Sequence, residues 1–289
     1  MNKKVGSYQI INFPAERRAM PAFLDLKSGR HVMYALLEVD VTVAKKFIED
    51  YKAQTGEQLS FTGYLAFCLA CAVDENKAVQ ACRKGSKQLV VFDDVDVGIM
   101  IELKQGETRV LTGHVIRGAN RKTFQEIHQE IRSVQTKPVP SNNGMPTWFR
   151  SALLLPWPLS GLFKALFRMI VRRNPMIVTS MAGTVGISSV GMFGKGHNGW
   201  GIADGTHVVD LIVGGTARKL AEAEGQIEAR EILSLTMEFD HDVIDGAPAA
   251  RFTRKLVELI ESGYGLDEFQ TMTPNDTKPA AVRTEQAPD

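Results

Sequence analysis

The chain has 289 residues, a formal net charge of +1, 44% hydrophobic residues and 23% charged residues. This composition is ordinary for a soluble globular protein, and the balanced charge excludes a global electrostatic drive toward nucleic acid. Three cysteines argue against a disulfide framework and favour a reducing compartment. The N-terminal stretch has a basic start but no apolar core, so we expect no signal peptide and a cytoplasmic location.

The first half of the chain mixes strands and helices. Strands are predicted over 33–42, over 87–103 as two strands joined at Asp93–Asp94, and over 110–120. Helices are predicted over 43–56, from Ser60 onward with a cap at Ser60–Thr62, and over 122–135. The helix after Ser60 is mostly apolar and should be buried. Its Cys68 and Cys71 lack a second pair of ligands, so we interpret them as core residues and expect no metal site.

The last third continues the mixture. Strands are predicted over 184–193, 207–219 and 231–240, and an amphipathic helix over 245–263. The strand 231–240 has the clearest alternation, with Leu235, Met237 and Phe239 on one face. Residues 269–289 lack large apolar side chains and are predicted to be a disordered tail. The order of elements predicts one α/β domain with a mixed sheet over residues 1–268.

Residues 131–203 contain no acidic residue. From Leu159 onward, one predicted helical face is apolar and the other basic. The apolar face holds Leu159, Leu162, Phe163, Leu166, Phe167 and Ile170, and the basic face holds Lys164, Arg168 and Arg172. One interpretation is a helix lying on a membrane surface. The other is a helix packed on its own domain or on a neighbouring subunit. Prolines and charges interrupt every window long enough for a transmembrane span.

The stretch FDHDVIDG, residues 239–246, places a histidine at a corner between a strand and a helix. The strand delivers His241 to its end, and Asp245–Gly246 opens the helix, so the imidazole can project into a cleft. Histidine is the usual general base for a thiol or hydroxyl near neutral pH. Asp245 can cap the helix or pair with a cation. Spacing alone leaves open a capped helix with an incidental histidine.

The stretch LSLTMEFDHDVIDGAPAARFTRKLVELIE resembles the His-x-x-x-Asp-Gly region of the CoA-dependent acyltransferase superfamily. The resemblance is strongest to the catalytic core of the dihydrolipoyl acyltransferases of 2-oxoacid dehydrogenase complexes. TVGISSVGMFG, HVVDLIVGG, 92–103 and 110–132 look like other strands and a helix of that core, and PAERRAM resembles its arginine-bearing entry helix. The resemblance covers most of 10–265. It implies a chloramphenicol acetyltransferase-like α/β fold, with a mixed β-sheet flanked by helices.

The resemblance also implies catalytic roles. His241 would take the proton from a thiol, which then attacks the thioester carbonyl directly without an acyl-enzyme. Ser188 matches the serine that stabilises the tetrahedral oxyanion, with Ser189 as the alternative. Asp245 would hold the active-site loop through an arginine of the entry segment. The residues expected to support the site are Arg17, Arg18 and Gly246.

Substrates and partners follow from the same resemblance. CoA or acyl-CoA is the expected substrate, and a homotrimer is expected, with His241 and Ser188 meeting across a subunit interface. No covalent lipoyl group is expected on this chain, because Lys77 is placed in the core, so a lipoyl-bearing protein would act in trans. The basic segment 137–180 is an insertion relative to the family. A lipophilic acceptor therefore remains an alternative to dihydrolipoamide. Two alternatives remain: a non-catalytic trimeric scaffold, and an acyltransferase that binds a membrane surface through 147–173.

Overall fold

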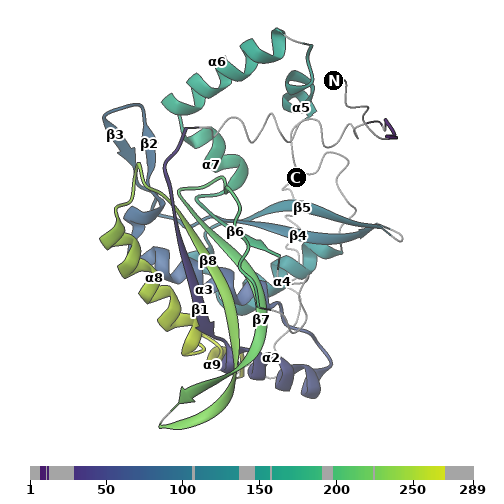
Figure 1. Cartoon of the computed structure of the whole chain (residues 1–289), viewed down its shortest axis with the longest axis vertical. Helices are drawn as coiled ribbons and strands as arrows, with labels where there is room; N and C mark the ends of the chain where they lie inside the picture. Colours follow the sequence, from purple (N-terminus) through teal and green to yellow (C-terminus); the bar gives the residue numbers. More distant parts are fainter. Residues whose placement is uncertain are drawn as a thin grey trace, which may run out of the picture.

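The computed structural model describes residues 7–10, 12, 29–105, 108–136, 147–156, 158–190, 198–223 and 225–270 (Figure 1). The strands are β1 Val32–Asp40, β2 Cys82–Lys84, β3 Gln88–Val90, β4 Val97–Gln105, β5 Thr108–Ile116, β6 Val185–Ser189, β7 Val209–Ala223 and β8 Gln226–Asp240. The helices are α2 Thr42–Thr55, α3 Phe61–Glu75, α4 Phe124–Gln135, α5 Thr147–Leu153, α6 Leu159–Arg173, α7 Met176–Ala182, α8 Gly246–Glu261 and α9 Asp267–Gln270. Two short 3-10 turns span Lys77–Gln80 and Ala119–Arg121.

Six strands form one mixed sheet in the order β1-β8-β7-β6-β4-β5. β6 runs parallel to β4 and to β7, whereas the pairs β4–β5, β7–β8 and β1–β8 are antiparallel. The 15-residue strands β7 and β8 form a long hairpin that extends beyond the rest of the sheet (Figure 1). The predicted mixed sheet is therefore confirmed, and β6 is a central strand held on both sides.

Helices α2, α3, α4 and α8 pack on one face of this sheet (Figure 1). β8 contributes Leu233, Leu235, Met237 and Phe239 to the core beneath them. α3 is buried almost all round, as its apolar sequence predicts, and the Ser60 hydroxyl accepts a hydrogen bond from the Gly63 amide at 3.0 Å. The buried Cys68 lies in this helix and is a core residue, as predicted. This helical layer packs against one face of β8, so the strand is held in place just before His241.

The opposite face of β8 is buried as well. Its polar residues Ser234, Thr236, Glu238 and Asp240 are at most 8% exposed. The segment 198–206 lies against this face, because the Gly205 amide donates to Glu238 at 2.8 Å and the Trp200 indole donates to the Leu37 carbonyl at 2.8 Å. Both faces of β8 are therefore packed, so its last residues form a rigid support for the corner at His241.

Several boundaries shift by a few residues from the sequence-based expectation, and two of the shifts change the core or the sheet. Phe269, placed in the tail by sequence, is 6% exposed and packs edge-on against Tyr51 at a ring distance of 5.2 Å. The core therefore extends to α9, while 271–289 lie outside the described residues. β8 begins at Gln226 rather than near 231, because its exposed first residues pair with the end of β7 instead of burying side chains.

The apolar face predicted for α6 is divided in two. Phe163 and Phe167 turn inward against Phe149 of α5 and form a small separate core with Leu153. The leucines at 159, 162 and 166 remain exposed. In the described part of the chain, no helix is long and apolar enough to cross a membrane.

Candidate active site

The corner between β8 and α8 presents His241. β8 ends at Asp240, and its carbonyl accepts the amides of Val243 and Ile244 at 3.0 Å each, which turns the chain toward α8. The His241 amide donates to the His31 carbonyl at 2.7 Å. The imidazole is 46% exposed. The predicted strand-to-helix corner is therefore present, with its main chain fixed and its imidazole accessible to a substrate.

Asp240 organises this turn from its buried position. Its carboxylate accepts the Asp242 amide at 3.0 Å and lies 3.4 Å from the Arg30 guanidinium. Arg30 also donates to the carbonyls of Thr206 and His207 at 3.0 and 2.8 Å. Burial raises the pKa of Asp240, and Arg30 opposes that shift. The sequence analysis assigned no role to Asp240. The feature that could have predicted one is a carboxylate at an alternating position of a mostly apolar strand.

A second ion-pair cluster holds the outer side of the corner. Asp242 contacts His31 Nδ1 at 2.7 Å and Arg83 Nη1 at 3.0 Å. The hydrogen bond to Asp242 raises the pKa of His31, and the hydrogen bond from His31 lowers the pKa of Asp242. These partners lie 211 and 159 positions from Asp242 in sequence, so no local pattern could have identified them.

Replacing Asp242 with asparagine is expected to return the pKa of His31 to about 6.5, its ordinary value. The protonated imidazole pairs with the carboxylate below the pKa of His31 and above that of Asp242, so the pair is lost as pH rises through the raised pKa of His31. Titration of the His31 ring protons by nuclear magnetic resonance measures this pKa. Asp245→Asn is the matched control and should leave it unchanged. An unaltered His31 pKa in Asp242→Asn would contradict the pairing.

Asp245 stands four residues after His241 at the start of α8. Its carboxylate is 88% exposed and lies 3.9 Å from His241 Nδ1, beyond hydrogen-bond length. Asp245 is the N-cap residue of α8, as predicted, and its carbonyl accepts the Ala249 amide at 3.1 Å, but its side chain makes no capping hydrogen bond. Arg17 and Arg18, its predicted partners, lie outside the described residues. A Cβ added at Gly246 would meet nothing within 4 Å.

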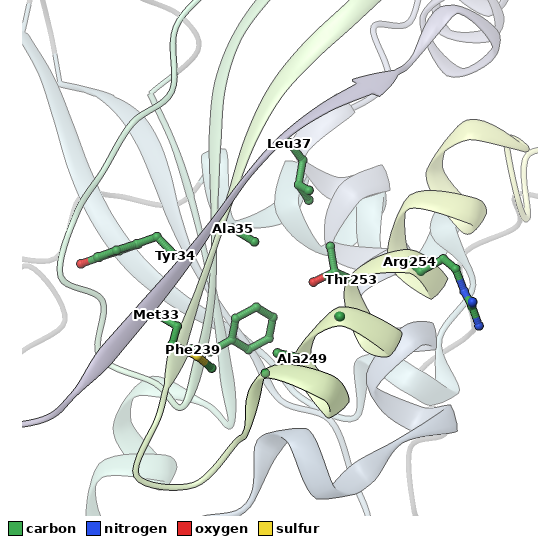
Figure 2. A pocket seen from close by; sticks show the side chains of 10 residues that line it. Met33, Tyr34, Ala35, Leu37, Phe239, Ala249, Thr253 and Arg254 are labelled. Atoms are coloured by element: carbon green, nitrogen blue, oxygen red, sulfur yellow. The ribbon is translucent and has the colours of Figure 1, made fainter.

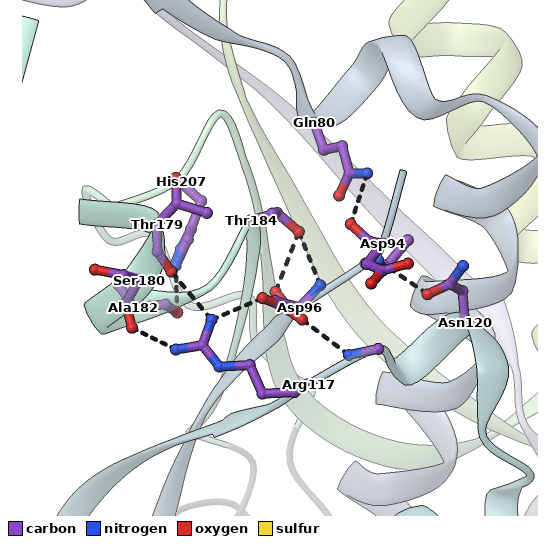
Figure 3. Close-up of polar contacts among 12 residues, drawn as sticks. Gln80, Asp94, Asp96, Arg117, Asn120, Thr179, Ser180, Ala182, Thr184 and His207 are labelled. Atoms are coloured by element: carbon purple, nitrogen blue, oxygen red, sulfur yellow. Dashed lines mark hydrogen bonds and ion pairs between the residues drawn. The ribbon is translucent and has the colours of Figure 1, made fainter. Parts of the chain in front are cut away.

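Ser188 and Ser189 end strand β6, and polar contacts fix the start of this strand (Figure 3). Arg117 donates to the Asp96 carboxylate at 2.7 Å and to the carbonyl of Ser180 in α7. The Thr184 amide donates to the Asp96 carbonyl at 2.7 Å. Together these bonds join the beginnings of β4 and β6 to the ends of β5 and α7, so β6 enters the sheet at a fixed position.

Gly186, in the same strand, is required by close packing. A Cβ at this position would lie 2.0 Å from Asp210 Oδ1 and 2.3 Å from His207 Nδ1. His207 itself bridges Asp210 at 2.6 Å and the Ala182 carbonyl at 2.9 Å. The buried pair and the glycine hold β6 tightly against β7, two residues before Ser188.

Ser188 is far from His241 within one chain. Ser188 pairs with Ile212, which pairs with Thr236, and Thr236 precedes His241 along β8. At about 3.4 Å per residue and about 4.8 Å per strand, roughly 20 Å separate the two residues. A single chain therefore does not bring the predicted base and the predicted oxyanion donor together.

An apolar groove of about 430 Å³ runs between β1 and α8. Met33 of β1 and its strand partner Phe239 of β8 lie together beside Ala249 of α8, and Thr253 lies farther along the helix (Figure 2). Gly246 also lines the groove, so its end lies at the first turn of α8, next in the chain to the histidine corner. The groove offers an apolar ligand a place beside the candidate base.

Comparison with known proteins connects these features to a family. The family model described as 2-oxoacid dehydrogenases acyltransferase (catalytic domain) matches residues 16–139 and 174–266. A curated relative is the dihydrolipoyllysine-residue succinyltransferase component of the 2-oxoglutarate dehydrogenase complex of Staphylococcus epidermidis. It is 21% identical over 255 residues, covering 86% of this chain and 51% of the relative. The chain thus spans about half the length of that relative.

Solved structures show the fold. The dihydrolipoamide acetyltransferase of Azotobacter vinelandii superposes with a TM-score of 0.59 at 19% identity, covering 89% of this chain and 94% of that one. Its structure was used to investigate a serine, a histidine and an asparagine in the catalytic mechanism of that enzyme. A chloramphenicol acetyltransferase superposes with a TM-score of 0.50 at 17% identity, covering 87% and 99%. The predicted chloramphenicol acetyltransferase-like fold is therefore confirmed.

Proposed function

Because the chain belongs to the family of 2-oxoacid dehydrogenase acyltransferase catalytic domains, we propose that it transfers an acyl group between CoA and a thiol acceptor. The family membership predicted from sequence is confirmed by the family model, which matches the chain on both sides of residues 140–173. The observation that carries the proposal is the half-exposed His241 at a rigid corner, followed four positions later by a carboxylate.

The chemistry needs one base and one oxyanion donor. His241 takes the proton of the acceptor thiol, and the thiolate attacks the thioester carbonyl of acyl-CoA. The Ser188 hydroxyl donates to the tetrahedral oxyanion. When this intermediate collapses, the C–S bond to CoA breaks and the protonated His241 returns its proton to the leaving CoA thiolate. The products are the acylated acceptor and free CoA, and no acyl-enzyme forms.

The spacing of residues in the Azotobacter vinelandii enzyme supports the roles of His241 and Asp245, and its serine interval matches Ser189 rather than Ser188. Its histidine precedes its asparagine by four positions and follows its serine by 52. His241 precedes Asp245 by the same interval, and it follows Ser189 by 52 and Ser188 by 53 positions. Asp245 thus stands in the place of the asparagine. Its carboxylate lies 3.9 Å from His241 Nδ1, too far for a hydrogen bond, so its proposed role is to attract the imidazolium that forms during the reaction.

The proposed active unit is a homotrimer in which two chains share each site. Ser188 and His241 lie roughly 20 Å apart within one chain, by strand rise and spacing, yet the mechanism requires both groups on one reacting thioester. A cyclic assembly solves this by placing the His241 corner of one protomer against the end of β6 in the next. The acyltransferase family that the sequence resembles is expected to form its site in the same way.

The proposed acceptor is dihydrolipoamide carried by another protein. The curated relative is named for transfer to a lipoyl-lysine residue, which supports a dithiol of this class. Lys77 does not suit a lipoyl attachment point, because it lies inside the region that matches the acyltransferase catalytic domain, directly after α3. The lipoyl group would therefore reach this site in trans, and CoA would enter as a free substrate.

The test is to incubate the trimer with acetyl-, succinyl- and branched-chain acyl-CoA, each with and without dihydrolipoamide. Chromatography measures acyl-dihydrolipoamide and free CoA. We expect at least one acyl-CoA to release CoA in a dithiol-dependent manner, with one acyl-dihydrolipoamide formed per CoA. If no acyl-CoA gives turnover above heat-denatured protein, the fold serves as a scaffold and the proposal is wrong.

A further inference from the structure

Among the described residues, helix α6 presents an apolar surface that no other element covers. Its residues Leu159, Leu162, Leu166, Met169 and Ile170, here called the outer α6 face, are 54%, 68%, 49%, 46% and 40% exposed. They recur at intervals of three and four residues, so they form one stripe along the helix. Leu155 just before the helix and Trp148 of α5 are also exposed. Single exposed leucines are ordinary, but a contiguous stripe of this kind marks an interaction site.

The outer α6 face cannot turn inward. The adjoining side of α6 is already packed, since the Phe149 ring lies 4.7 Å from the Phe167 ring and 5.8 Å from the Phe163 ring. Both rings come from the side of the helix that faces α5. Figure 1 shows α6 at the edge of the molecule, away from the sheet and from α3 and α8. The stripe is therefore fixed outward, where a flat surface can reach it.

The charge of α6 indicates which kind of surface the outer α6 face binds. Helix α6 carries Lys164, Arg168, Arg172 and Arg173 and contains no acidic residue. Two copies of this surface placed face to face would bring like charges together, which is unfavourable. An anionic surface instead complements it. An apolar stripe on a helix whose polar side is rich in Lys and Arg is the pattern of a helix lying in a membrane interface.

The segment also stands apart from the shared family core. The family match ends at residue 139 and resumes at 174, so α5 and α6 fall between the two matched parts. What the chain has in common with its family therefore does not explain the outer α6 face. The described helices include none that could cross a bilayer.

We propose that the outer α6 face binds the surface of an anionic lipid bilayer and holds the enzyme at the membrane. The apolar side chains enter the boundary between headgroups and acyl chains, to a depth of about 5–10 Å. The cations of the segment lie near the anionic headgroups. The proposal does not depend on the acyltransferase reaction, because a binding measurement tests it without turnover.

The test is co-sedimentation of the full chain with vesicles of phosphatidylcholine alone and with vesicles containing one quarter phosphatidylglycerol. We expect binding to the anionic vesicles at low salt, and weaker binding when salt is raised, because salt screens surface charge. The double substitution Leu162→Glu/Leu166→Glu should weaken binding by at least about tenfold, because it places two carboxylates in the apolar stripe.

The matched control is Leu220→Glu/Ile227→Glu, at the tip of the β7–β8 hairpin, where the two side chains are 78% and 76% exposed. This pair makes the same chemical change at equal or greater exposure and should bind vesicles like the unmodified chain. Failure of the unmodified chain to sediment with anionic vesicles at low salt overturns the proposal. Equal loss in both double variants, or equal binding to neutral vesicles, overturns it as well. If only the oligomeric mass changes in the α6 variant, a neighbouring subunit covers the face instead.

Discussion

Replacing His241 with alanine is expected to lower kcat/KM for acyl transfer by about 10²–10⁴-fold, the usual contribution of a general base. Without the imidazole, the acceptor thiol must lose its proton to solvent, and the leaving CoA thiolate loses its proton donor. The side chain is 46% exposed, and its main-chain amide, which holds the corner, remains after the substitution. The variant should therefore fold normally, which circular dichroism and the oligomeric mass can verify.

His31→Ala is the matched control for this experiment. His31 is the neighbouring exposed histidine, with 82% of its side chain accessible, and it supports the corner through its main-chain carbonyl. Arg83 remains paired with Asp242 when the imidazole is removed. We expect the rate to stay within a few-fold of that of the unmodified chain. Full activity in His241→Ala, or an equal loss in His31→Ala, would show that His241 is not the base.

The elements that carry the histidine were predictable because their signals are local. Alternating apolar residues defined β8, and an amphipathic repeat with Phe252 and Leu256 buried defined α8. The N-cap residue Ser60 likewise predicted the start of the buried helix α3. A strand followed by a helix fixes a corner between them, so the position of His241 followed from sequence patterns that span only a few residues.

The supports of the corner were not predictable, because they depend on contacts between distant segments. Arg30 reaches Asp240 from the start of β1, and Arg83 reaches Asp242 from β2. A sequence pattern also cannot state which partner a helical face will meet. The periodicity of α6 predicted one apolar face, yet in the structure Phe163 and Phe167 pack against α5 while Leu159, Leu162 and Leu166 stay exposed. Phe269 was missed for the same reason, since its neighbours come from α2 and α4.

A mixture of two inactive variants is expected to recover activity if the site is shared. Ser188→Ala removes the oxyanion donor and should lower kcat by about 10²–10³-fold, and His241→Ala removes the base. In a mixed trimer, the histidine of a Ser188→Ala chain can meet the serine of a His241→Ala chain. Random assembly of equal amounts makes about one quarter of the sites intact. Co-expression and measurement of acyl-dihydrolipoamide formation therefore should give about one quarter of the unmodified rate.

A second mixture separates a shared site from a site within one chain. The unmodified chain is co-expressed in equal amounts with a chain carrying both substitutions. If each site takes one residue from each of two chains, about one quarter of the sites are intact, whereas a site within one chain leaves about one half. Recovery in the first mixture with one quarter in the second establishes the shared site. No recovery in the first mixture with about one half in the second would mean that Ser188 and His241 act within one chain. If Ser188→Ala alone keeps the unmodified rate, Ser188 is not the oxyanion donor, and Ser189→Ala, tested in the same pair of mixtures, decides whether its neighbour is.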